Sequence, residues 1–126
     1  MVFTTRVNNT ALKLKMKLVH NTDLKYNDFY QRLLNATINF SMVDTENGKY
    51  KIANKKAKLI FEDNEFGDVG ESKIYLSYEF SKRDLNTVGY FRGEFGIYFN
   101  DCDTELHVPV AEKLYINILD SITKFN

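Results

Sequence analysis

The chain has 126 residues, of which 44% are hydrophobic and 27% are charged, with 10 Phe, 8 Tyr and no Trp. This length and composition predict one folded domain and exclude a disordered chain. The 17 basic and 17 acidic residues cancel, which argues against nucleic acid as a partner because phosphate binding needs a basic surface. The single cysteine, Cys102, cannot form an internal disulfide, so we expect packing alone to stabilise the fold.

The first residues of the chain contain no apolar stretch of signal-peptide length. No later stretch approaches the roughly 18 apolar residues that a membrane span requires. We therefore expect a protein that is made in the cytoplasm without a signal peptide and has no membrane partner. We place a single domain over residues 1–126, with an N-terminal arm over about residues 1–10.

Hydrophobic residues alternate with polar residues along much of the chain, which is typical of strands with one buried face. The first such run, residues 12–18, places Leu14 and Met16 opposite a series of lysines and predicts the first strand. Residues 23–34 show approximate helical spacing after a cap residue, Asp23. This segment predicts one short helix or turn.

Residues 38–43 and 50–52 repeat the alternation on either side of a turn sequence at 44–48. This arrangement predicts a hairpin. Two further strands are expected at residues 57–61 and 74–80.

The longest alternating run, residues 90–99, predicts a central strand. Residues 106–108 precede Pro109, the only proline, which cannot donate to a ladder and marks an edge or the end of a strand. Residues 114–118 predict the closing strand. Together these runs predict an all-β antiparallel sandwich of about seven to eight strands with at most one short helix. The core is expected to include the inward-facing residues Leu14, Phe40, Leu76, Phe95, Ile97 and Ile116.

Charge is distributed unevenly between the two halves of the sequence. Residues 1–61 carry 11 basic and 4 acidic residues, whereas residues 62–126 carry 6 and 13. The preferred interpretation is that the charges intermix on the folded surface, because strands from both halves interleave in a sandwich. The alternative is a polarised surface suited to head-to-tail assembly.

Residues that could support catalysis or metal binding are sparse. The two histidines, His20 and His107, lie near expected strand ends without a motif for nucleophilic or metal-dependent catalysis, and we interpret them as surface residues. The acidic loop at 62–71 lacks the spacing of a calcium-binding loop, and residues 101–103 provide too few ligands for zinc. We therefore predict no catalytic residue, no cofactor and no metal.

Residues 78–95 read Tyr-Glu-Phe-Ser-Lys-Arg-Asp-Leu-Asn-Thr-Val-Gly-Tyr-Phe-Arg-Gly-Glu-Phe: an aromatic strand end, then Asp, then Gly, an aromatic residue and Glu-Phe. This stretch resembles the phage immunoglobulin-like domain found in related virion components and, as the N-terminal domain, in upper baseplate proteins. Residues 38–42, and Pro109 before residues 115–118, are similar to further landmarks of that family. The resemblance covers about residues 36–118 and implies an immunoglobulin-like sandwich and a virion location.

Sandwich domains often fix the crossover into a central strand with a tyrosine hydroxyl that bonds back to the preceding loop. The inward register puts Phe91 in that position, and Phe has no hydroxyl. We therefore expect the corner to be held either by packing alone or by the neighbouring Tyr90.

The resemblance implies a non-catalytic structural protein of a bacteriophage virion. Because the chain ends about eight residues after its last expected strand, we prefer an auxiliary protein that decorates or cements the capsid. Its partners would be other virion proteins, first the major capsid protein, and further copies of itself in the particle. The alternatives are a tail or baseplate component and, from another class, a carbohydrate-binding module with sugars stacked on exposed tyrosines. An enzyme would require distant residues to converge.

Tyr90, Tyr98 and Tyr115 fall on the outward phase of their strands and are the candidate partner contacts. Tyrosine is enriched where an interface needs a large apolar body with a polar tip. The alternative is that these rings only cover the outer sheet, since single exposed aromatic residues are ordinary. The contact interpretation requires the rings to cluster.

Overall fold

The computed structural model describes residues 1–18, 31–62 and 73–125. Within these ranges the chain forms nine strands arranged as an all-β, two-sheet sandwich. The alternation predicts this class, and the structure adds one strand to the expected seven or eight. The strands are β1 (Val2–Arg6), β2 (Lys13–Leu18), β3 (Thr37–Asp44), β4 (Tyr50–Lys56), β5 (Lys58–Glu62), β6 (Lys73–Glu79), β7 (Gly89–Phe99), β8 (Thr104–Val108) and β9 (Leu114–Leu119).

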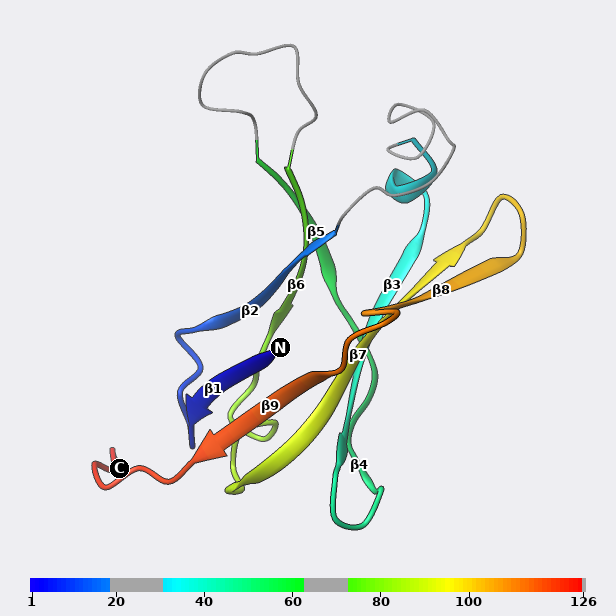
Figure 1. The fold of residues 1–126 in the computed structure, drawn as a ribbon. Coiled ribbons are helices and arrows are strands. Elements are labelled where there is room, and N and C mark those ends of the chain that lie inside the picture. The colour runs from blue at the N-terminus through cyan, green and yellow to red at the C-terminus, as the bar shows by residue number, and fades with distance from the viewer. Residues whose placement is uncertain (19–30, 63–72, 126) are drawn as a thin grey trace.

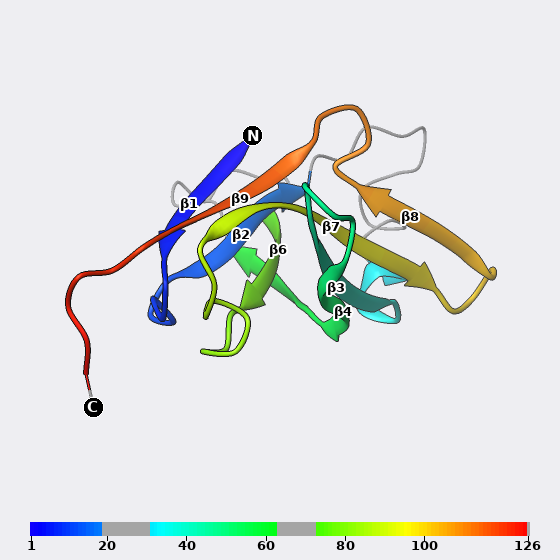
Figure 2. The same cartoon turned by 90° about the horizontal axis from the view of Figure 1, so that it is seen from below.

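The larger sheet has the order β1-β9-β7-β3-β4, and the smaller sheet has the order β2-β6-β5. The long strand β7 pairs with β3 along one edge, whereas its other edge is shared between two strands. Gly89–Gly93 pair with β9, and Phe95–Phe99 pair with β8. Figures 1 and 2 show that the β7–β8 hairpin extends to one side of the molecule, away from the C-terminal residues that follow β9.

The core predicted from the alternation is confirmed. All six expected residues are at most 2% exposed and belong to one hydrophobic cluster between the sheets. Phe40 of β3 lies at its centre, with ring centroids 4.7 Å from Tyr78 of the smaller sheet and 4.9 Å from Phe95 of the neighbouring strand. Aromatic pairs at these separations stabilise a core beyond the area they bury.

Several sequence expectations need correction at the ends of the chain and in its loops. The strand expected to be first is the second, because Val2–Arg6 form β1, which pairs in parallel with β9. Only residues 31–34 of the predicted helical segment are described, and they form one short helical turn. His20 and most of the acidic loop lie outside the described residues. The strand break at Pro109 is confirmed, since β8 ends at Val108.

The opposite charges of the two sequence halves meet on the folded surface. Lys13 and Lys58 of the basic half both lie against Glu79 of the acidic half, with N–O distances of 3.1 and 3.8 Å. Arg32 pairs with Asp101 at 3.5 Å. The described ion pairs therefore support the intermixed interpretation.

The corner between β6 and β7 is held by Tyr78 and Asp84, and not by packing alone or by the Tyr90 hydroxyl as the sequence predicts. The Tyr78 hydroxyl donates a 2.9 Å hydrogen bond to the buried carboxylate of Asp84, which also accepts one from the Ser81 amide. Burial, followed by the hydrogen bond and charge of Asp84, raises the pKa of the Tyr78 hydroxyl. Tyr90 contributes its carbonyl oxygen, which accepts bonds from the amide and hydroxyl of Thr45. The corner is thus fixed from the end of β6 and not from the start of β7.

We expect Tyr78→Phe to lower the free energy of unfolding by about 1–3 kcal/mol, because it removes one partner of a buried charged group. Tyr115→Phe is the matched control, since no hydroxyl bond of Tyr115 to a described residue is present. Urea denaturation of both variants measures the difference. Equal stability of the two variants would contradict a structural role for the buried bond.

Gly93 provides a second test of the core. A Cβ at this position would lie 2.5 Å from Cδ1 of Ile116 and 2.9 Å from Cζ of Phe40, whereas a Cβ at Gly96 would lie 3.7 Å from His107. We expect Gly93→Ala to destabilise the fold by about 1–3 kcal/mol through overpacking. Gly96→Ala should change stability by less than about 0.5 kcal/mol. Thermal and urea unfolding of the pair check this, and a neutral Gly93→Ala would contradict the tight packing around Phe40.

Candidate functional site

The outer face of the larger sheet, which points away from the core, carries all three tyrosines that the sequence singles out. On β7 the odd-numbered residues from Phe91 to Phe99 are buried, so Tyr90 and Tyr98 point outward. On β9 the inward residues are Leu114, Ile116 and Ile118, so Tyr115 also points outward. The alternation alone therefore predicts correctly that these three tyrosines point away from the core.

Tyr90 and Tyr115 lie together on adjacent strands. Their rings are stacked, with centroids 4.9 Å apart and an interplanar angle of 15°. The strand registers place Tyr115 in a row across five strands, formed by Val2, Tyr115, Arg92, Val43 and Tyr50. We call this row, with Tyr90 stacked beside it, the tyrosine row. Val2 and Tyr50 are 57% and 67% exposed, so the row presents apolar and aromatic surface around one arginine.

Tyr98 does not belong to this cluster. It lies eight residues further along β7 than Tyr90, a separation of about 27 Å in an extended strand. Its hydroxyl donates a 2.5 Å hydrogen bond to Oδ1 of Asp103 in the β7–β8 turn, and this bond raises the pKa of the Tyr98 hydroxyl. The structure therefore brings two of the three candidate tyrosines together and places the third in different surroundings.

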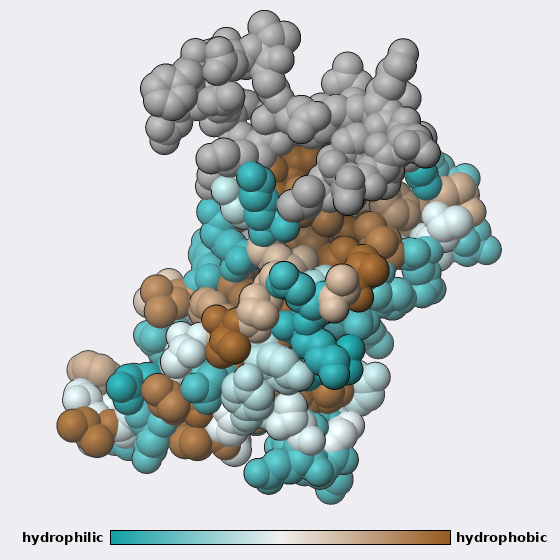
Figure 3. Space-filling model, viewed as in Figure 1, coloured by the Kyte–Doolittle hydropathy of each residue, from teal (hydrophilic) through white to brown (hydrophobic). Residues whose placement is uncertain are grey.

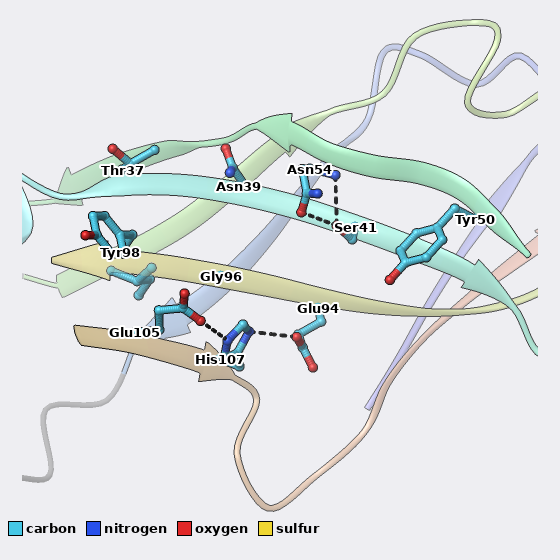
Figure 4. A pocket seen from close by; sticks show the side chains of 11 residues that line it. Thr37, Asn39, Ser41, Tyr50, Asn54, Glu94, Gly96, Tyr98, Glu105 and His107 are labelled. Carbon is cyan, nitrogen blue, oxygen red and sulfur yellow. Dashed lines mark hydrogen bonds and ion pairs between the residues drawn. The ribbon is translucent and has the colours of Figure 1, made fainter. Parts of the chain in front are cut away.

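A polar groove with Tyr98 at one end lies at the β8 end of the outer face (Figure 4). Its volume is about 290 Å³, close to the lower end of the range for small-molecule sites, about 300–1,000 Å³. The groove is lined by Thr37, Asn39, Ser41, Tyr50, Asn54, Glu94, Gly96, Ile97, Tyr98, Glu105 and His107.

His107 connects two carboxylates along one wall of the groove. Its Nδ1 lies 2.9 Å from Oε1 of Glu94, and its Nε2 lies 3.0 Å from Oε2 of Glu105 (Figure 4). The hydrogen bond to Glu105 raises the pKa of His107 most, the bond to Glu94 and both charges add to it, and partial burial opposes the rise. The expectation of a surface histidine is confirmed for His107, whose side chain is 53% exposed, but the sequence did not predict its carboxylate partners.

The opposite wall is formed by β3 and a distorted part of β4. The Ser41 hydroxyl accepts a 2.9 Å hydrogen bond from the backbone N–H of Asn54. It donates a 3.3 Å bond to the side-chain oxygen Oδ1 of the same residue. Asn54 has a positive φ of 51°, a conformation that Asn tolerates better than most residues, beside a shift in the β3–β4 register. The side-chain amide of Asn39 makes no hydrogen bond with any described residue.

Other candidate features of the described chain do not form a site. No group of three or more His, Cys, Asp or Glu side chains within the described ranges is arranged to hold a metal ion. Residues 101–103 form part of a turn, as expected, with Cys102 accepting a 2.7 Å bond from Arg32. No helix in the described segments has the length and apolar character needed to span a bilayer.

An apolar hollow lies beside the short helical turn and β5. Leu33, Leu34, Ala36, Leu59 and Phe61 are among its lining residues. Figure 3 shows hydrophobic surface adjoining the grey segments. These lining residues are close in sequence to segments outside the described ranges. We therefore assign no function to the hollow.

The chain matches no protein-family model, and no curated protein matches it either. The outer face offers two chemically different surfaces, the tyrosine row and the polar groove.

We expect the pKa of His107 to lie above its usual 6.5. The two carboxylate bonds favour the protonated ring, so their stabilisation is fully present below about pH 6.5 and is lost as the pH rises through the raised pKa. An NMR titration of the His107 ring measures the midpoint. Glu105→Gln should lower it more than Glu94→Gln, and a wild-type midpoint at or below 6.5 would contradict the bridge.

Proposed function

We propose that this protein is a non-catalytic structural component of a bacteriophage virion, an auxiliary protein that binds the capsid through the tyrosine row. The resemblance to phage immunoglobulin-like domains motivates the virion location. The stretch that carries it, residues 78–95, spans the end of β6, the buried Asp84 corner and the first half of β7. These are the elements that position Tyr90 and Arg92 on the outer face.

The tyrosine row is the observation that carries the binding role. Tyr and Arg are the residue types that most often dominate the energetics of protein interfaces. Here Arg92 lies between Tyr115 and Val43 in the strand registers, and the stacked Tyr90 holds Tyr115 in place. Rigid aromatic rings on a sheet lose little conformational freedom when a partner binds.

The partner in this proposal is another virion protein, first of all the major capsid protein, with further copies of this chain as neighbours in the particle. A tail or baseplate location is the second candidate, because the resemblance is to a domain of upper baseplate proteins. Both locations use the same surface, so the position in the particle distinguishes them.

We expect the double variant Tyr90→Ser, Tyr115→Ser to reduce binding to purified particles by at least about tenfold, as loss of interface anchors does. Tyr98→Ser is the matched control on the same strand and should bind as the wild type does. Co-sedimentation with particles measures retention, and circular dichroism confirms that each variant is folded.

Two outcomes would contradict the proposal at different levels. Full retention of the folded double variant would show that the contact lies elsewhere on the protein. Absence of the wild-type protein from purified particles, measured by mass spectrometry, would overturn the virion role itself.

A further inference from the structure

We propose that the polar groove at the β8 end of the outer face binds one neutral pyranose residue of a glycan. This role goes beyond the proposed virion contact, because it uses the other end of the same face. Tyr50 is the one residue of the tyrosine row that also lines the groove. The strand registers arrange the groove in three rows: Ser41 beside Glu94, then Asn39, Gly96 and His107, then Thr37, Tyr98 and Glu105.

Gly96 creates the hollow. It lies between Asn39 and His107 in the middle row, and its missing side chain leaves the floor open where every flanking position carries a larger residue. The walls are formed by Tyr98 at one end and by His107 with its two carboxylates at one side (Figure 4). A volume of about 290 Å³ suits one sugar ring better than a larger ligand.

The lining carries amide and carboxylate groups that can form hydrogen bonds with neighbouring hydroxyls of a sugar. Asn39 offers an amide with no described partner, and Asn54 is held in place by Ser41. An amide donates and accepts at once, and each carboxylate of Glu94 and Glu105 keeps acceptor capacity beyond its bond to His107. Because Asn54 is held by Ser41, and Glu94 and Glu105 are held by His107, a ligand would order few side chains on binding besides Asn39.

Tyr98 supplies the apolar component that a sugar ring needs. Its hydroxyl is tied to Asp103, so the orientation of the ring is fixed at the edge of the groove. Tyr98 is 36% exposed, and its ring can cover the C–H face of a pyranose. A rigid aromatic surface beside amide and carboxylate groups is suited to a ligand with one apolar face and a polar rim.

The charge of the groove selects against anionic ligands. Glu94 and Glu105 are acidic, and His107 is the only described lining residue that can carry positive charge. The net charge of these three groups is negative whether or not His107 is protonated. Phosphates, sulfated sugars and uronic acids would therefore be repelled, which leaves a neutral sugar as the ligand.

Titration of the ¹⁵N-labelled full chain with sugars, followed by NMR, tests the proposal. The probes are methyl glycosides of glucose, galactose, mannose and N-acetylglucosamine, short neutral oligomers of the same sugars, and glucuronate as the anionic comparison. We expect shifts of the Gly96 amide and of the Asn39 and Asn54 side-chain amides with at least one neutral probe. If a monomer shifts these amides as strongly as its oligomer does, the groove binds a single sugar residue. If the oligomer causes the larger shifts, the ligand is a polysaccharide chain.

Two variants and one control locate the site. Gly96→Ala places a methyl group on the floor at an ordinary contact distance from His107, and Tyr98→Ala removes the ring. Tyr98→Ala should weaken sugar binding by about tenfold, the upper end of what one aromatic contact contributes. Gly96→Ala should weaken it because the added methyl group occupies the floor of the groove. Tyr90→Ser should bind sugar as the wild type does, and Gly96→Ala should remain bound to particles.

No shift with any neutral probe would overturn the proposal, and so would glucuronate binding as tightly as the neutral sugars. Sugar binding that is unchanged in folded Gly96→Ala and Tyr98→Ala would place the ligand outside the groove and also overturn it. The particle assay is separate, because it depends on Tyr90 and Tyr115. Failure of the glycan site and failure of the virion proposal are therefore distinguishable.

Discussion

The position of the Phe40 ring is the constraint on which the rest of the structure depends. The ring stacks on Tyr78 across the two sheets and packs at a tilt against Phe95 within its own sheet, and Gly93 leaves the space that it occupies. This packing fixes the register of β3 against β7, because a slip of one residue would move Phe40 to the solvent side. The same contact orients Tyr78, whose hydroxyl then holds Asp84 and closes the corner into β7.

Once that register is fixed, β7 determines the chemistry of the outer face. One edge of the strand is shared by β9 and β8, so its first half lies beside Tyr115 and its second half beside His107 and Glu105. The first half therefore carries the aromatic and arginine surface, and the second half carries the polar groove around Gly96. In our two proposals, one end of this sheet meets a protein partner and the other end meets a small polar ligand.

The polar network of the groove and the buried corner illustrate different uses of carboxylates in this fold. Asp84 is buried and is satisfied by a hydroxyl and a backbone amide, so it stabilises the connection between the sheets. Glu94 and Glu105 remain accessible, hold His107 between them and line the groove. The buried Asp84 therefore has a structural role, whereas the exposed Glu94 and Glu105 remain accessible to a ligand.

The sequence by itself determined the all-β class, the six core residues and the outward direction of the tyrosines, because a two-residue period assigns each side chain to a face. It did not reveal β1, whose parallel partner is more than a hundred positions away, or the Tyr78–Asp84 bond at the corner. Only the tertiary structure placed Asn39, Gly96 and His107 in one row and separated Tyr98 from Tyr90 and Tyr115. The physical reason is that alternation specifies which face a residue occupies, whereas the order and register of strands decide which residues on that face become neighbours.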